Sequence, residues 1–516
     1  MLPVALCLVL CLPLLANAGA IFNNRNRRQE TPAQAAIIIT ATQVVTAVHT
    51  DVQTHTVQVS KTTTLGQSSS SLTSTTSSVS SSSASASQTE FSVSFLPPPS
   101  SASPSPTPKV IDEISIGLVP NPTTSPVPPL ASSSPAASPS PSSKPLVAAY
   151  YADWTADDLA PENIDFTRFD WIDFAFGIPD KNQNVGFSQD DSAQLLDRLV
   201  TAAHSHGSKV KLSIGGWTDS GHFSTCVSTS TTRQTFVTNI VNLYHQHNLD
   251  GIDIDWEYPG ENGASGNTQS PSDTANFLTF LQLLRTSLPP NAKISAAAQV
   301  WPFADSNGDP LKDASAFAKV LDWVLIMNYD IWGSSSNPGP NAPLSNACEN
   351  STQPLANAVS AVKSWTAANF PANQLLLGIP SYGYVSISSA THLVQRGLTH
   401  ARATNPVTVL DDDGQDNGGQ VQFASLISQG ALQKDDTGHY VGAGSFQRYW
   451  DECSSTPFLR SQVAGQVITY DDPDSIRMKA AFAKSAGILG VNMFDAHGDT
   501  IQWELIDAAR EGLDLI

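Results

Sequence analysis

The second part of the chain alternates short apolar runs with amphipathic stretches. In the stretches at 191–207 and 274–288, apolar residues recur every three or four positions, which predicts helices. The runs are rich in β-branched and aromatic residues, which predicts buried strands. The eight runs occupy 147–154, 171–178, 209–217, 249–258, 293–301, 322–330, 374–384 and 487–499.

Eight strands alternating with helices predict an α/β fold, the parallel (β/α)8 TIM barrel, over residues 146–516. The seventh and eighth runs are roughly 100 residues apart, far more than one crossover helix needs. We therefore expect a small α+β insertion between strands 7 and 8, at about 385–470.

The first 145 residues do not have the pattern of a packed domain. Residues 1–18 are apolar and end in small residues at Ala16 and Ala18, which predicts a secretory signal peptide; the run is shorter than the ~20 apolar residues of a membrane span. Residues 19–60 alternate apolar and polar positions in places, but we assign no structure or role to this segment. Residues 61–145 are dominated by Ser, Thr and Pro, which predicts a disordered linker, either an O-glycosylated stalk or an inert spacer.

Charge is distributed unevenly between these two parts. Residues 146–516 carry 20 basic and 41 acidic residues, a formal charge of −21 that exceeds the −20 of the whole chain. A domain this acidic repels phosphate backbones and anionic lipid surfaces, so nucleic acid and membrane partners are not expected. We expect a monomer, secreted and either extracellular or associated with the cell wall.

The cysteines do not have the spacing of metal ligands, and we expect neither a metal nor another cofactor. Cys7 and Cys11 lie in the predicted signal peptide. Of the remaining three, Cys348 and Cys453 lie in polar, loop-like sequence and are the predicted disulfide, although Cys226 is an alternative partner. The sequon at Asn350 predicts an N-glycosylated surface loop.

Acidic and aromatic residues gather late in the predicted strands. In a TIM barrel, reactive groups lie at the carboxyl ends of the strands, so these side chains are expected to share one face. Sugar rings stack on aromatic side chains while carboxylates bind hydroxyls, and the combination predicts a carbohydrate cleft. The residues are Trp217, Asp253, Asp255, Glu257, Tyr258, Trp301, Tyr329, Asp330, Trp332, Tyr382 and Asp495.

The most informative segment is DGIDIDWE at 250–257. Because side chains alternate across a strand, Asp253, Asp255 and Glu257 point to one side. Carboxyls this close share a proton, and the pKa of at least one of them rises, which suits a general acid. A cation site is less consistent with the pattern, because the spacing does not fit a Ca²⁺ loop. A solvated strand would not place Ile and Trp between the acids.

Four motifs in order resemble the family 18 glycoside hydrolases, the chitinases. They are KLSIGGW at 211–217, DGIDIDWEYP at 250–259, MNYD at 327–330 and YDDPDSIRMKAAFAKSAGILGV at 470–491. The resemblance covers about 146–516 and implies a retaining mechanism in which the substrate's own 2-acetamido group is the nucleophile.

The resemblance also implies roles for individual residues. Glu257 would protonate the glycosidic oxygen and then activate water. Asp255 would hydrogen-bond the acetamido N–H and stabilise the oxazolinium ion, and Asp253 would share a proton with it. Tyr329 would donate to the acetamido oxygen. The remaining candidate substrate contacts are Asp330, Trp217, Tyr258, Trp301, Trp332, Tyr382, Phe494, Tyr150 and Phe176.

The chain departs from the family pattern at two places. Phe494 stands where the family usually has a Trp as the floor of the cleavage subsite, which removes aromatic area and the indole N–H. In the seventh strand, Tyr384 replaces the Arg of the frequent YGR sequence. The glycines of the third-strand motif, Gly215 and Gly216, are interpreted as structural.

These features predict a chitinase acting on chitin or another N-acetylglucosamine-containing glycan. Two alternatives remain open: an endo-β-N-acetylglucosaminidase on N-glycans, and a chitin-binding lectin on the same barrel. The intact Glu257 favours an enzyme. The sequence does not separate endo from exo action.

Overall fold

The computed structural model describes residues 40–47, 55–62, 144–393, 407–416 and 418–516. The chain divides into two units, Met1–Pro128 and Pro129–Ile516. In the first unit, β1 (Thr40–Ala47) pairs with β2 (His55–Thr62) in an antiparallel hairpin. The second strand extends by two residues into the segment predicted as a linker. The predicted signal peptide and nearly all of that linker lie outside the described residues.

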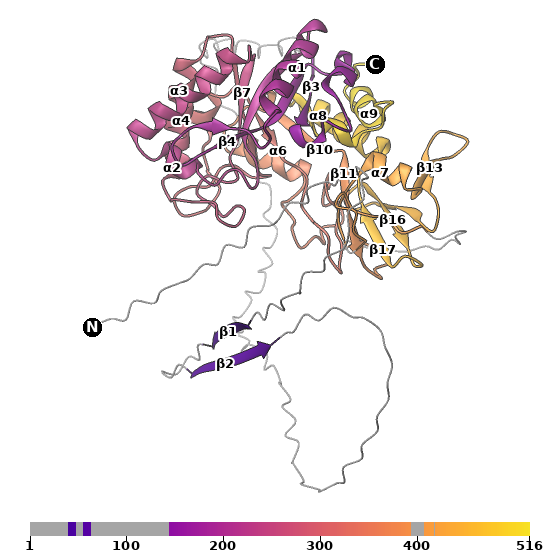
Figure 1. Cartoon of the computed structure of the whole chain (residues 1–516). Helices are drawn as coiled ribbons and strands as arrows, with labels where there is room; N and C mark the ends of the chain where they lie inside the picture. Colours follow the sequence, from indigo (N-terminus) through magenta and orange to yellow (C-terminus); the bar gives the residue numbers. More distant parts are fainter. Residues whose placement is uncertain (1–39, 48–54, 63–143, 394–406, 417) are drawn as a thin grey trace, which may run out of the picture. The chain divides into compact units, whose positions relative to one another are not determined.

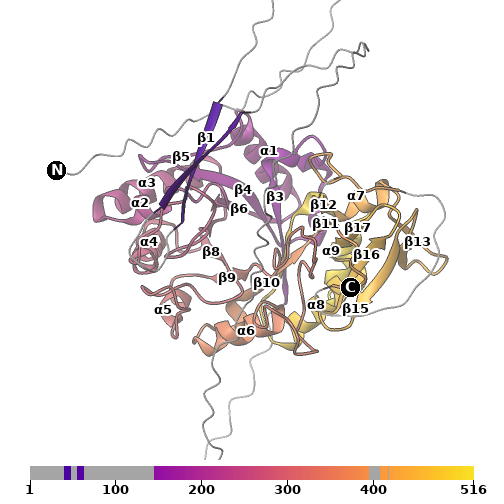
Figure 2. The same cartoon turned by 90° about the horizontal axis from the view of Figure 1, so that it is seen from below.

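In the second unit, eight parallel strands close into a barrel, as the alternating runs predict (Figures 1 and 2). Each strand pairs with the next barrel strand along the chain, and β3 closes the circle by pairing with both β18 and β4. The short β5 (Val185–Gly186) pairs antiparallel with β4. The barrel strands are β3 (Leu146–Ala152), β4 (Trp171–Pro179), β6 (Lys209–Gly215), β7 (Gly251–Asp255), β8 (Lys293–Ala298), β9 (Trp323–Ile326), β10 (Leu375–Pro380) and β18 (Gly490–Phe494).

Helices surround the barrel, and their starts follow from local sequence (Figure 2). Thr229 and Thr232 form a reciprocal capping box at the start of α3, and Asp472 and Ser475 do the same for α8, with Pro473 in its first turn. The helices are α1 (Ser192–Ser205), α2 (Phe223–Val227), α3 (Ser230–Gln246), α4 (Asp273–Ser287), α5 (Ser315–Ala318), α6 (Ala358–Ala367), α8 (Pro473–Ser485) and α9 (Glu504–Gly512), with short 3₁₀ turns η1 (Asp153–Thr155), η2 (Pro161–Asn163), η3 (Phe166–Arg168), η4 (Ala372–Gln374) and η5 (Ala496–Gly498).

The predicted insertion is an α+β lobe between β10 and β18, beside the barrel (Figure 2). Its first strand belongs to the seventh apolar run, which therefore contains two strands separated by Ser381. The lobe has a five-stranded antiparallel sheet in the order β12-β11-β17-β16-β15. Its elements are β11 (Tyr382–Ile387), β12 (Gly419–Gln422), α7 (Phe423–Ser428), the hairpin of β13 (Leu432–Lys434) and β14 (Tyr440–Gly442), β15 (Gln447–Asp451), β16 (Thr456–Ser461) and β17 (Gln466–Thr469).

A disulfide joins Cys348, between β9 and α6, to Cys453, between β15 and β16, as predicted. Cys226 is buried and unpaired, and its Sγ donates to the Asp180 carbonyl oxygen at 3.3 Å. In the described ranges, no helix is long and apolar enough to cross a membrane.

Replacing both Cys348 and Cys453 by Ser is expected to lower the free energy of unfolding by about 2–4 kcal/mol. The bond links residues 105 positions apart, so its loss frees a long loop in the unfolded chain. Urea unfolding of wild type and variant measures the difference. A reducing agent should destabilise wild type to the same extent and leave the variant unchanged. Equal stability of wild type and variant, each with and without the reducing agent, would contradict the prediction.

Candidate active site

Strand β7 positions the predicted acids, and the expected alternation is observed. Ile252 and Ile254 are fully buried in the core between barrel and helices. Asp253 and Asp255 are also buried, on the opposite face of the strand, inside the barrel. Gly215 lets neighbouring β6 approach β7 closely, because a Cβ at this position would lie 2.0 Å from the Asp255 carbonyl oxygen. The φ of Gly215 is +116°, a conformation that favours glycine.

Asp253 lies among hydroxyl donors. Tyr150 Oη donates to its Oδ2 at 3.0 Å, Ser213 Oγ donates to the same oxygen at 2.8 Å, and Ser295 Oγ donates to Oδ1. Tyr150 is fully buried and lies outside the lining of the cleft, where its hydroxyl binds Asp253; its contact with substrate stays a prediction.

Asp255 has the opposite environment. Its Oδ1 is buried without a hydrogen-bond partner. Burial, followed by the charges of Glu257 and Asp253, raises its pKa well above the ordinary value. The raised pKa favours the protonated form of Asp255.

Glu257 follows the end of β7 and faces the cleft. Its backbone N–H donates to Ser220 Oγ at 2.9 Å, which fixes the main chain at this point. Burial raises its pKa to about 7, with a hydrogen bond from Tyr258 opposing the shift and the charge of Asp330 adding to it. A carboxyl with this pKa can hold and release a proton near neutral pH.

Tyr329 and Asp330 follow β9 at the same end of the barrel. The hydroxyls of Tyr382 and Tyr384 each donate to Asp330 Oδ1 at 2.7 Å. Tyr384, which replaces the usual Arg, thus contributes a hydroxyl to the Asp330 carboxyl. Burial and the charge of Asp255 raise the pKa of Tyr329 well above its ordinary value, so it remains a hydroxyl donor.

A cleft of about 1100 Å³ opens at this end of the barrel. The acids and tyrosines that line it include Asp255, Glu257, Tyr329, Asp330, Tyr382 and Tyr384. Trp332 is not part of the lining, contrary to the prediction: it lies after the strand end, and its ring occupies the space beside Gly339. The predicted aromatic residues that do line the cleft are Phe176, Trp217, Tyr258, Trp301, Tyr329, Tyr382 and Phe494.

The cleft also contains residues that the sequence reasoning missed. Trp154 is 54% exposed in the lining, as Trp217 is at 53%, and its position at the end of the first apolar run was the available signal. The lobe contributes Asp411–Asp413 and Gln422, which had no recognisable motif. Burial raises the pKa of Asp412 to about 6.

A buried ion pair below the acids was missed as well. Lys211 on β6 lies 2.9 Å from Asp173 on β4, and both side chains are inaccessible to solvent. The signal was a lysine two residues before Ser213, on the face of the strand that points into the barrel.

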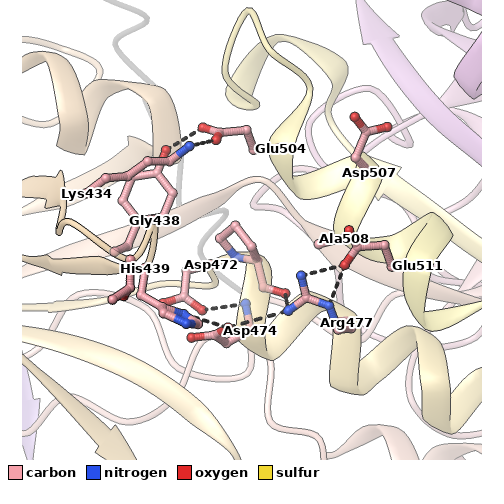
Figure 3. A pocket seen from close by; sticks show the side chains of 13 residues that line it. Lys434, Gly438, His439, Asp472, Asp474, Arg477, Glu504, Asp507, Ala508 and Glu511 are labelled. Carbon is pink, nitrogen blue, oxygen red and sulfur yellow. Dashed lines mark hydrogen bonds and ion pairs between the residues drawn. The ribbon is translucent and has the colours of Figure 1, made fainter. Parts of the chain in front are cut away.

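A second, smaller pocket of about 270 Å³ lies between the β13–β14 hairpin and helices α8 and α9 (Figure 3). Its basic groups are paired within it: Lys434 binds Glu504, and Arg477 binds Glu511 at 2.6 Å. Because these charges are neutralised by their partners, we assign no binding or catalytic role to this pocket. Among the described residues, no cluster of His, Cys, Asp or Glu has the arrangement of a metal site.

A closed (β/α)8 barrel with buried acids and an aromatic cleft at the carboxyl ends of its strands has the features of a glycan-binding barrel. Residues 146–499 match the model of the glycosyl hydrolases family 18, and the chain belongs to this family, as its motifs predict.

Known proteins similar to this chain carry chitinase names. A chitinase-like effector from Moniliophthora perniciosa is 36% identical over 394 residues, which cover 72% of this chain and 88% of the effector. Chitotriosidase-1 from Mus musculus is 27% identical over 362 residues, covering 67% of this chain and 71% of that protein. The crystal structure of a chitinase from Rhizomucor miehei superimposes with a TM-score of 0.61 at 30% identity, covering 71% of this chain and 99% of that one.

Proposed function

We propose that this protein is a secreted chitinase that hydrolyses β-1,4 bonds between N-acetylglucosamine units. The observation that carries the proposal is the arrangement at β7: two buried aspartates, of which Asp255 has a raised pKa, next to a glutamic acid whose pKa is about 7. One acid without a second carboxylate nucleophile suits a substrate that supplies its own nucleophile.

In the proposed first step, Glu257 gives its proton to the glycosidic oxygen while the acetamido oxygen attacks the anomeric carbon. The bond to the leaving sugar breaks, and a cyclic oxazolinium ion forms. Asp255 accepts a hydrogen bond from the acetamido N–H, Tyr329 donates to the acetamido oxygen, and the negative charge of the aspartate pair offsets the cation. In the second step, Glu257 takes a proton from water, which attacks the same carbon and restores the acetamido group.

The rest of the proposal concerns location and binding. Secretion is proposed from residues 1–18 and a spacer role from the Ser/Thr/Pro-rich segment, with the barrel acting as a monomer. Asn350 of the sequon is exposed, so its position suits a glycan. Trp154 and Trp217 are proposed as stacking platforms for sugar rings, because both indoles are exposed in the cleft.

The alternatives are an endo-β-N-acetylglucosaminidase and a non-catalytic lectin. The effector relative leaves the second open, whereas Glu257, Asp255 and Tyr329 in one cleft favour hydrolysis. The test is to incubate the purified protein with chitin and with a high-mannose glycopeptide and to analyse the products by mass spectrometry. Soluble oligosaccharides from chitin support a chitinase. Release of the glycan alone supports the first alternative, and binding without products supports the second.

The pH dependence of hydrolysis should show the titration of Glu257. Because Glu257 is an acid catalyst, activity is expected to fall as pH rises through about 7, where it loses its proton. Tyr258→Phe removes a hydrogen bond that lowers the pKa of Glu257, so this basic limb should move to higher pH. The measurement is kcat/KM on a soluble oligosaccharide across pH 5–9. A limb that stays in place or moves to lower pH in the variant would contradict the assignment.

A further inference from the structure

A lysine is buried inside the barrel, directly below the proposed catalytic acids. Lys211 is 1% exposed on β6, two residues before Ser213, on the face that points inward. A buried ammonium is costly unless it is paired and hydrogen-bonded, and an apolar side chain would fill this space without that cost. The charge of Lys211 is therefore expected to have an electrostatic role.

The contacts of Lys211 lead to the aspartate pair. Its Nζ donates to Ser295 Oγ at 2.6 Å, and the Ser295 hydroxyl in turn donates to Asp253 Oδ1. The ammonium lies 2.9 Å from Asp173 Oδ1 and 3.8 Å from Asp253 Oδ1. It also lies over the ring of Trp323, 4.7 Å from the centroid.

Asp173 is fixed in place beside this lysine. Its Oδ2 accepts a hydrogen bond from Asn492 Nδ2 at 2.9 Å. Burial raises the pKa of Asp173 to about 6, against the lowering effect of Lys211, so Asp173 is largely protonated in mildly acidic solution. Asp253 lies within reach of the same cation and accepts three hydroxyl hydrogen bonds of its own.

The other groups around Asp253 do not supply a positive charge. Neighbouring β8 places only the hydroxyl of Ser295 opposite Asp253. The titratable or charged neighbours are Tyr150 on β3, Asp173 on β4, Lys211 on β6, Asp255 on β7 and Tyr329 after β9. In this set of described neighbours, Lys211 is the cation.

We propose that Lys211 is a positioning residue for the aspartate pair: its charge and its hydrogen bond through Ser295 keep Asp253 anionic, so that the shared proton stays on Asp255 beside Glu257. The effect on hydrolysis rests on the proposed function. The effect on the proton of the aspartate pair does not.

The test is the acidic limb of kcat/KM, where the aspartate pair takes up its second proton. Lys211→Met removes the cation and is expected to move this limb to higher pH by about one unit. Asp173→Asn breaks the same ion pair but keeps the cation, so its limb should stay in place or move to lower pH. An unmoved limb in Lys211→Met, or an upward shift in Asp173→Asn, overturns the proposal.

A double variant separates charge from folding. Lys211→Met leaves Asp173 buried without its partner, which lowers stability, whereas Lys211→Met/Asp173→Asn leaves neither group unpaired. The double variant is expected to regain melting temperature and to keep the upward shift. Return of its limb to the wild-type position would show that Lys211 serves only Asp173 and would overturn the proposal.

A readout without substrate distinguishes this proposal from the proposed function. Infrared titration of the buried carboxyl band should show the pair taking up its second proton about one unit higher in Lys211→Met than in wild type. If wild type is inactive on chitin but this shift is present, the proposed function fails and the role of Lys211 stands. If wild type is active on chitin but the shift is absent, the proposed function stands and the role of Lys211 fails.

Discussion

Glu257→Gln is expected to lower kcat on a soluble chitooligosaccharide by about 10²- to 10⁴-fold, the usual contribution of a general acid. Gln has the shape of Glu but cannot give a proton to the glycosidic oxygen, and no other carboxyl in the cleft has been assigned that role. The side chains that bind sugar are unchanged, so the affinity for the oligosaccharide should remain within a few-fold of wild type.

The measurement combines steady-state kinetics with calorimetric binding. Glu511→Gln is the matched control: the same substitution on α9, at a surface ion pair with Arg477, should leave both quantities nearly unchanged. Equal rates for wild type and Glu257→Gln would show that the acid is another residue. Equal inertness with intact binding would favour the lectin alternative.

Asp255→Asn is expected to lower kcat by about 10²- to 10³-fold, in the range seen when one group that stabilises a charged intermediate is removed. Asn keeps the shape of the side chain but can no longer carry the proton that the aspartate pair shares. The oxazolinium ion would then lack a neighbour whose protonation adjusts to its charge. The KM should change less than kcat, because the cleft aromatics are unaffected.

Asp219→Asn is the control for this variant, since Asp219 lines the same cleft but lies outside the aspartate pair. It is expected to keep kcat within about threefold of wild type, as a surface substitution would. A similar loss in both variants would mean that the cleft responds to its total negative charge. A loss in neither would remove Asp255 from the mechanism.

The barrel was predictable because each strand carries its own signal. Buried parallel strands produce apolar runs, and crossover helices produce the intervening period of three to four residues. The inward direction of Asp253 and Asp255 followed from the two-residue period of a strand. The lobe was predicted as a small α+β insertion without its individual strands, since short antiparallel strands have weak local patterns.

The rest of the site depended on contacts between distant segments. Tyr150 was expected to contact sugar, yet its hydroxyl reaches Asp253 from a neighbouring strand. Trp332 was expected in the cleft because it follows a strand end, but its ring packs beside Gly339 instead. Lys211 was visible only as a polar residue in an apolar strand, and its partner Asp173 lies on another strand. The residue types in the strands were enough to predict a catalytic site. The partners of each side chain could be assigned only from the three-dimensional structure.

The unequal environments of Asp253 and Asp255 explain how one strand holds two different aspartates. Asp253 accepts three hydroxyl hydrogen bonds, whereas Asp255 is buried with an unpartnered oxygen and a raised pKa. The same principle separates the roles of paired carboxyls in other acid catalysts.

Retaining hydrolysis with the acetamido group as nucleophile can be followed by proton NMR of a chitooligosaccharide during the first minutes of reaction. Attack by the acetamido oxygen followed by water gives two inversions at the anomeric carbon. We therefore expect the new reducing end to appear first as the β-anomer and to equilibrate only later. Initial appearance of the α-anomer, or no cleavage by the wild-type protein, would contradict it.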